Sequence, residues 1–122
     1  LRGYNGEWVN DSTAARTIGV ALRDAFAASL GIQATEFGSF AHPSRTEDGS
    51  PCRSIFIFDR FAAGYSSRAG IYLNALIPKA IQRLHCPANC DSACPRCILD
   101  FDQRFETDRL DRKRALELFQ AV

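Results

Sequence analysis

The stretch Cys86-Pro-Ala-Asn-Cys90-Asp-Ser-Ala-Cys94-Pro-Arg-Cys97 packs four cysteines into twelve residues, with three, three and two residues between successive thiols. A tetrahedral metal ion needs four ligands on a chain that doubles back, and short Cys-x2-4-Cys turns supply that geometry. Pro87 and Pro95 each follow a cysteine and restrict the backbone, which lowers the entropy lost when the ligands are gathered. The spacing therefore predicts a metal site with the ligands Cys86, Cys90, Cys94 and Cys97.

Zinc is the ion that this spacing favours, because a Cys94-x2-Cys97 hook after two longer gaps is typical of a closed structural knuckle. An iron–sulfur cluster, which is also held by four thiolates, stays open as the alternative. Structural disulfides are disfavoured, since cysteines at such spacing bridge with strain and no other feature of the chain indicates secretion. Cys52 lies in a strand-like stretch, and we expect it to be a small buried residue rather than a ligand.

Composition and charge limit the classes of protein to which the chain can belong. The chain has 122 residues, 46% apolar and 24% charged, which is typical of one soluble globular domain. Four thiolates and one zinc dication would take the formal charge from +1 to −1, so the chain is not a strongly basic nucleic-acid binder. No apolar run is long enough for a membrane span and no signal peptide is visible, so we expect a cytoplasmic protein without membrane contact. Since the chain begins at Leu1, we expect residues 1–122 to be a single zinc-binding domain cut from a longer protein.

Hydrophobic periodicity predicts an α+β fold. Apolar residues at helical spacing predict helices near residues 13–30 and 67–85, and Pro78 predicts a kink or break in the second helix near Leu76. Residues 54–58 form a continuous apolar run, which predicts a central strand covered on both faces. The polar residues 42–51 between this strand and a strand-like stretch at 32–40 predict a hairpin loop. A final helix is predicted after Asp108 and Asp111, with an apolar face made of Ala115, Leu118, Phe119 and Val122.

The sequence offers little for catalysis. A zinc ion with four thiolate ligands has no position left for water, and no phosphate-binding Gly-x4-Gly-Lys-Ser/Thr loop is present. Asp59, His42 and His85 are titratable residues near predicted loops, but no spacing signals a catalytic triad or dyad. An enzyme that uses Asp59 and a histidine is therefore a distant rival, and His85 is expected to donate a hydrogen bond to the metal site or to cap the helix.

The order of these features resembles a known family. Helix, strand, His42-Pro43, a polar loop, Ile55-Phe-Ile-Phe58-Asp59, the small-residue turn Ala62-Ala-Gly64-Tyr65, a second helix, four cysteines and Leu110-Asp-Arg112 together resemble the MrfA-type zinc-binding domain. The resemblance implies that the four cysteines are the metal ligands, and it matches Asp59, Gly64 and Asp111 to motif positions without an assigned role. The chain departs from the family in the turn, which usually reads Pro-Gly-Gly-Ala-Gly, and in Cys86-x3-Cys90, which is commonly Cys-x-Cys.

Function follows from the resemblance as an expectation. Domains of this family sit at the C-terminal end of DEAD/DEAH-box superfamily 2 helicases, including DNA-repair helicases, and in anti-phage defence systems such as DISARM. The resemblance implies an accessory structural zinc-binding domain that supports DNA engagement, with the helicase core of the parent chain or a partner subunit, and DNA, as partners. The alternative is a protein-interaction module that docks through Phe101 and Phe105. The candidate phosphate contacts are Arg83, Arg96, Arg104, Arg109 and Arg112.

Overall fold

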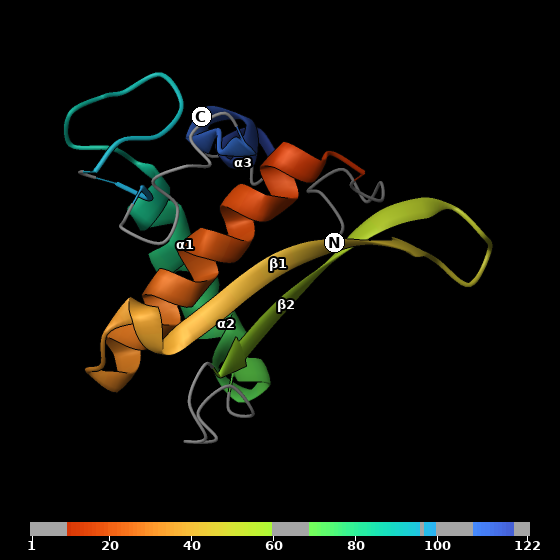
Figure 1. Ribbon diagram of the computed structural model, residues 1–122, viewed down its shortest axis with the longest axis horizontal. Helices are drawn as coiled ribbons and strands as arrows, with labels where there is room; N and C mark the ends of the chain where they lie inside the picture. Colours follow the sequence, from red (N-terminus) through yellow and green to blue (C-terminus); the bar gives the residue numbers. More distant parts are fainter. Residues whose placement is uncertain (1–9, 60–68, 96, 100–108, 119–122) are drawn as a thin grey trace.

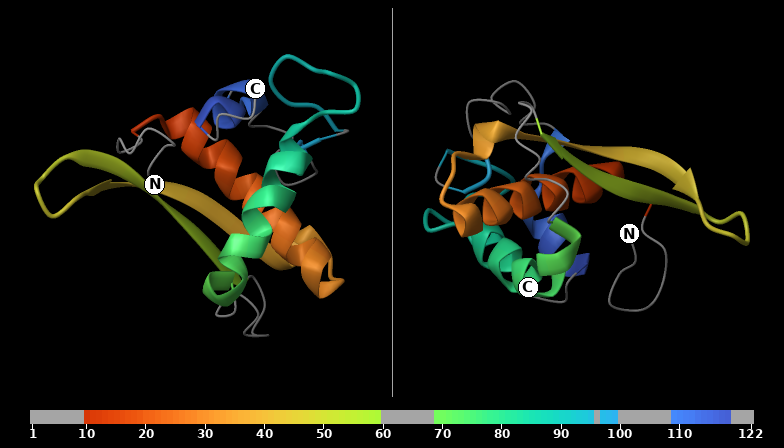
Figure 2. Two further views of the ribbon diagram at one scale, coloured as in Figure 1. Left: turned by 180° about the vertical axis from the view of Figure 1, so that it is seen from behind. Right: turned by 90° about the horizontal axis from the view of Figure 1, so that it is seen from below.

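The computed structural model describes residues 10–59, 69–95, 97–99 and 109–118. In chain order these residues form α1 (Ser12–Leu30), the short 3-10 helix η1 (Ala34–Glu36), β1 (Phe37–Arg45), β2 (Pro51–Asp59), α2 (Ala69–Leu84) and α3 (Arg112–Leu118). The two strands form an antiparallel hairpin, and α1 lies between this hairpin and the pair α2 and α3 (Figure 1, Figure 2). The predicted α+β class, with a small sheet covered by helices, is confirmed.

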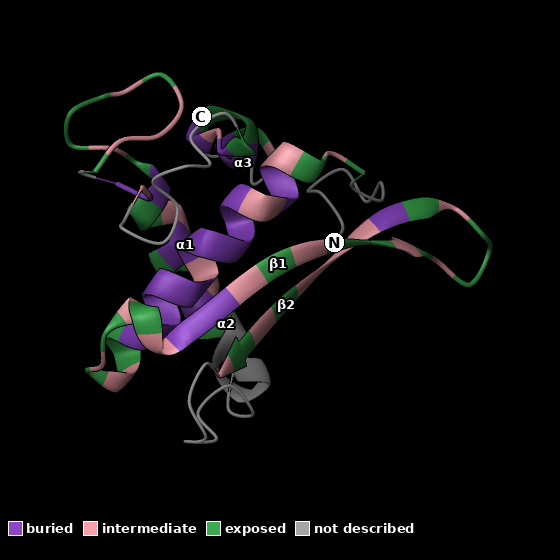
Figure 3. Cartoon of the chain, in the orientation of Figure 1, coloured by how far each residue is buried: buried purple, intermediate pink, exposed green. Residues whose placement is uncertain are grey.

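Helix α1 is the centre of the fold, and its ends and composition suit that position. Asp11 caps it by accepting a hydrogen bond from the amide of Ala14 at 3.1 Å, and Gly31 ends it in the left-handed region at φ 71°. Its small residues let the hairpin approach α1 closely, because a Cβ placed at Gly19 would lie 3.2 Å from Cγ2 of Ile55 in β2. Most of α1 is therefore buried (Figure 3), and the predicted helix at 13–30 is confirmed.

The hairpin differs from its prediction in two ways. Its register runs from Phe37 opposite Asp59 to Arg45 opposite Pro51, so the loop is shorter than the predicted residues 42–51. Pro43 lies inside β1 because an edge strand tolerates a proline that lacks an amide hydrogen. The prediction of a central strand covered on both faces is wrong, because in the described residues the sheet has two strands and the apolar run alternates between its two faces.

Helix α2 packs along α1 and continues through Pro78. Of the predicted kink or break near Leu76, the break does not occur. Proline removes the bond to the carbonyl four residues earlier, that of Asn74, and both residues are exposed, so water can satisfy this carbonyl. Leu76, Ala80 and Leu84 recur at four-residue spacing and form the buried face of α2. No helix in the described residues is both long and apolar enough to span a membrane.

The core links all the elements around α1. Phe26 of α1 stacks on Phe37 of β1 with ring centroids 4.9 Å apart, and both rings are fully buried. Helix α3 joins from the other side, where the amide of Asp111 donates to Oγ1 of buried Thr17 at 2.8 Å. The carboxylate of Asp111 accepts bonds from the amides that open α3, as predicted, and Ala115 packs in the core. Asp108, Phe119 and Val122 lie outside the described residues.

Candidate metal centre

The loop after α2 brings the four predicted cysteines together. Their sulfur atoms all lie within 4.8 Å of one another, and no histidine or carboxylate joins this group among the described residues. The Sγ–Sγ distances are 3.4 Å for Cys86 and Cys94, 3.7 Å for Cys90 and Cys97, and 3.9 Å for Cys94 and Cys97. A tetrahedron with metal–sulfur bonds of 2.3 Å has sulfur–sulfur edges of about 3.8 Å. The four thiols therefore fit a single tetrahedral zinc ion, whereas a cluster of several irons would hold them further apart.

Two tight turns and the end of α2 position these sulfurs. Cys86 follows the last turn of α2, and the amide of Asn89, which has a φ of 52°, closes the first turn by donating to the carbonyl of Cys86 at 3.0 Å. In the second turn the amides of Cys97 and Leu99 both donate to the carbonyl of Cys94 at 3.1 Å. Cys97 is buried with its neighbour Ile98 in the core, so this end of the loop is fixed to the body of the protein.

The thiols differ in how readily they ionise. The backbone amide of Cys90 is the main cause that lowers the pKa of Cys86 to about 6. Burial raises the pKa of Cys97 to about 12, and burial also raises the pKa of Cys90, although the side chain of Arg112 opposes this second shift. Cys86 is thus available as a thiolate near neutral pH, while a cation has to displace the protons of the buried thiols.

Arg112 is the residue that connects this loop to α3. Its Nε donates to the carbonyl of Cys90 at 2.9 Å and lies 3.3 Å from Sγ of the same residue. The guanidinium also donates to the side chain of Asn89 at 3.1 Å and to the carbonyl of Leu84, the last residue of α2, at 3.4 Å. The backbone amide of Arg112 donates to Ser92 at 2.8 Å. A buried cation beside four thiolates offsets part of their negative charge, so Arg112 both shapes and neutralises the site.

The five arginines predicted as phosphate contacts differ in their exposure and in their partners. Arg83 on α2 keeps 44% of its side chain exposed and forms an ion pair with Asp24 at 3.3 Å. Arg109, just before α3, is exposed. Arg112 is only 5% exposed and its guanidinium donates into the cysteine loop, so the prediction that it contacts phosphate is wrong. Arg96 and Arg104 lie outside the described residues.

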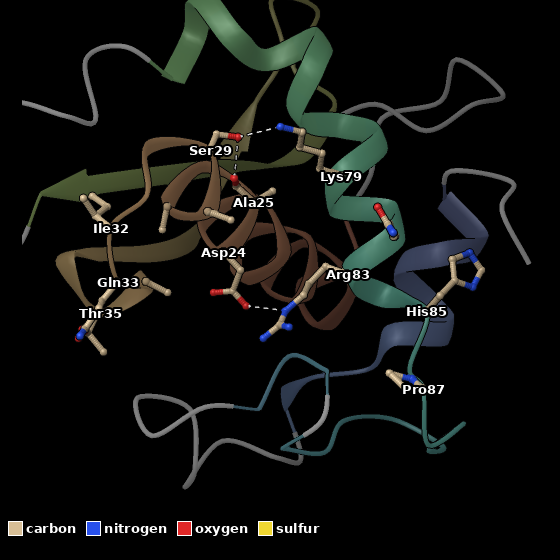
Figure 4. A pocket seen from close by; sticks show the side chains of 14 residues that line it. Asp24, Ala25, Ser29, Ile32, Gln33, Thr35, Lys79, Arg83, His85 and Pro87 are labelled. Atoms are coloured by element: carbon tan, nitrogen blue, oxygen red, sulfur yellow. Dashed lines mark hydrogen bonds and ion pairs between the residues drawn. The ribbon is translucent and has the colours of Figure 1, made fainter.

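A groove of about 830 Å³ runs between α1 and α2 and reaches the start of the cysteine loop at His85 and Pro87 (Figure 4). Lys79 and Arg83 of α2 point into it, where Nζ of Lys79 lies 3.2 Å from Oγ of Ser29 (Figure 4). The sequence analysis missed Lys79. The sequence does contain a signal for Lys79: it lies four residues before Arg83, a spacing that puts the two cations on one face of α2.

The structure separates Asp59 from His42, one of the two histidines of the rival enzyme hypothesis. Asp59 ends β2, whereas His42 pairs with Ser54, five residues earlier along the same strand. Five residues of extended strand span about 17 Å, so these two side chains cannot share a proton. His85 is exposed and lines the groove, and its predicted contact with the metal site stays a prediction. The turn at residues 62–64 lies outside the described residues.

Comparison with known proteins gives one family match. The family model described as the MrfA Zn-binding domain matches residues 18–98, about two thirds of the chain. The matched range contains α1 from residue 18 onward, the hairpin, α2 and all four cysteines, whereas α3 with Arg112 follows it. A search of curated proteins and a search of solved structures gave no match.

Proposed function

Because the chain belongs to the MrfA Zn-binding domain family, we propose that it is the accessory zinc-binding domain of a superfamily 2 helicase-like protein and supports that protein's engagement with DNA. The parent protein would act in DNA repair or anti-phage defence in the cytoplasm. Its helicase core, in the same chain or in a partner subunit, would be the nearest partner of the domain. Four thiolates would close the coordination sphere of the ion, so the role of the metal would be structural and not catalytic.

The zinc ion, when bound, cross-links the loop that follows α2. The chain's own residues extend that cross-link: Arg112 ties the loop to α3, and Thr17 ties α3 to α1. Metal binding therefore fixes the end of α2 relative to α1. The surface between these two helices is the surface that the metal site holds rigid.

The observation that carries the proposal is the basic groove on this surface. Lys79, Arg83 and His85 line it from α2 and the residue that follows, whereas Asp24 is its one carboxylate among the described residues. Ser29 and Asp24 hold the two cations over the groove, at 3.2 and 3.3 Å. Lys79 has only a hydroxyl partner here, Arg83 keeps 44% of its side chain exposed, and the buried Asp24 is also paired with Arg23 at 2.9 Å, so both cations can turn to the phosphates of a nucleic acid.

The test is DNA binding by the zinc-loaded protein as a function of salt, measured by fluorescence anisotropy. The double variant Lys79→Gln/Arg83→Gln should weaken binding about tenfold and lower the slope of log K against log salt by about 1 to 2, because two phosphate contacts are lost. Lys113→Gln is the matched control, since Lys113 is an exposed cation on α3 that pairs with Asp91 at 3.5 Å, away from the groove. Unchanged affinity and slope in the double variant would overturn the role of the groove.

A further inference from the structure

The four sulfurs of the cysteine loop differ in how far solutes can reach them from water. Cys97 is only 1% exposed and is shielded by the core. Cys86 and Cys94 are half-buried, and exposed residues flank Cys86 on both sides and follow Cys94 directly. The reactions of a cysteine with small oxidants depend on the access of the oxidant to the sulfur, so this difference is a chemical one.

Cys90 is half-buried as well, but a buried cation lies against its sulfur. Nε of Arg112 donates to Sγ of Cys90 at 3.3 Å and to the carbonyl of the same residue at 2.9 Å, and Arg112 is only 5% exposed. A hydrogen bond from a cation is charge-assisted and draws electron density from the thiolate that accepts it, whereas the backbone amide that donates to Cys86 is neutral. Burial and Arg112 thus protect Cys97 and Cys90, and leave Cys86 and Cys94 open to attack.

The two open sulfurs also lie close together. Sγ of Cys86 and Sγ of Cys94 are 3.4 Å apart, compared with 3.7 Å for Cys90 and Cys97 and 3.9 Å for Cys94 and Cys97. An oxidised cysteine becomes a disulfide when a second thiol reaches its sulfur. Access and distance therefore select the same pair, Cys86 and Cys94.

We propose that Cys86 and Cys94 form an oxidation site through which hydrogen peroxide removes zinc from the protein. One of the two thiolates attacks peroxide, so that an S–O bond forms, the O–O bond breaks and hydroxide leaves. The other thiolate attacks the resulting sulfenic sulfur, so that the S–S bond forms, the S–O bond breaks and a second hydroxide leaves. The two sulfurs give up two electrons, one peroxide is reduced, and both hydroxide ions take protons from the solvent.

The metal centre does not survive this step. A sulfur in a disulfide is no longer the thiolate that binds a metal, so the site keeps two of its four ligands, Cys90 and Cys97. Two thiolates do not complete a tetrahedral zinc site, and the cross-link of the loop after α2 is lost with the ion. Thiols reduce disulfides by exchange, so the modification is reversible. The inference rests on the metal centre and not on the proposed engagement with DNA.

The test treats the zinc-loaded protein with about one molecule of hydrogen peroxide per chain. A chromogenic zinc indicator measures the released ion. Two alkylating reagents, one applied before reduction and one after it, mark free and oxidised cysteines for mass spectrometry. We expect the label of oxidised cysteines on Cys86 and Cys94, the label of free thiols on Cys90 and Cys97, and loss of zinc in step with loss of the two thiols.

Two further measurements complete the test. Dithiothreitol followed by zinc should restore the thiols and the bound metal, because a disulfide is reducible by thiols whereas a sulfinic acid is not. Cys52→Ser is the matched control. It removes the cysteine that lies outside the loop, so it should lose zinc at the wild-type rate.

Four results would overturn the proposal. They are a first disulfide that contains Cys90 or Cys97, retention of zinc after two thiols have been consumed, oxidation that dithiothreitol does not reverse, and a protein that keeps its zinc and its thiols in excess peroxide. None of these measurements uses DNA, so each of these results would leave the proposed role of the groove at Lys79 and Arg83 intact. Conversely, a groove that does not bind DNA would leave the oxidation site intact.

Discussion

Replacing Arg112 with methionine tests how the chain builds its metal centre. Methionine has a similar length and apolar stem but cannot donate to the carbonyls of Leu84 and Cys90 or to the side chain of Asn89. Each buried acceptor that loses its donor costs about 1 kcal/mol, so we expect the zinc-loaded protein to lose about 3 kcal/mol of unfolding free energy. Most of this loss should depend on zinc, because two of the three acceptors, in Asn89 and Cys90, belong to the loop that the metal orders.

The effect of Arg112 on zinc affinity can be estimated separately. Replacing a residue that holds metal ligands in place typically weakens metal binding 10- to 100-fold, which equals about 1.4 to 2.8 kcal/mol. The destabilisation caused by Arg112→Met should therefore be about 1.4 to 2.8 kcal/mol smaller without zinc than with zinc. The assay is urea unfolding of Arg112→Met and of the wild type, with zinc and with chelator, together with a zinc competition titration. The charge-conserving Arg112→Lys should fall between methionine and wild type, and Lys113→Gln should change neither quantity. A zinc affinity of Arg112→Met within twofold of wild type would refute the reasoning.

Three further substitutions test the packing around α1. Thr17→Val should cost about 1 to 3 kcal/mol in urea unfolding, because the partly buried amide of Asp111 loses its acceptor, whereas Thr17→Ser should cost less. Phe26→Ala should cost about 3 to 5 kcal/mol by the same assay, since the ring is fully buried against Phe37, and a smaller loss would mean that the site collapses around the cavity. Gly38→Ala should leave zinc content unchanged and alter near-ultraviolet circular dichroism, because the new methyl group displaces the exposed ring of Phe58, and an unchanged spectrum would contradict that placement.

The sequence predicted best what is decided locally. The ligand spacing from Cys86 to Cys97 fixes which residues can surround one ion, and the structure brings these four together. The span of α1 was also predictable, because Asp11 and Gly31 are strong local signals for its ends. Both predictions rest on residues a few positions apart, where spacing and geometry are closely linked.

The sequence failed where distant residues decide the outcome. Arg112 stands in a run of mixed charges and was predicted to contact phosphate, yet its acceptor Cys90 lies 22 residues away and draws it into the protein. The run at 54–58 was read as buried on both faces, because a short apolar run does not show that Phe56 and Phe58 face water. The groove at Lys79 and Arg83 depends on how α2 packs on α1, which no local pattern encodes.

The central claim is that one zinc ion, held by four thiolates, stabilises this fold. The most direct measurement is the metal content per chain of protein purified without added metal, combined with urea unfolding, for wild type, Cys94→Ser and Cys52→Ser. We predict one zinc per wild-type chain, loss of zinc and a lower urea midpoint in Cys94→Ser, and full zinc content in Cys52→Ser, since Cys52 lies in β2 outside the cysteine group. Several irons per chain with visible absorption, or a metal-free Cys94→Ser protein with the urea midpoint of the wild type, would contradict the claim.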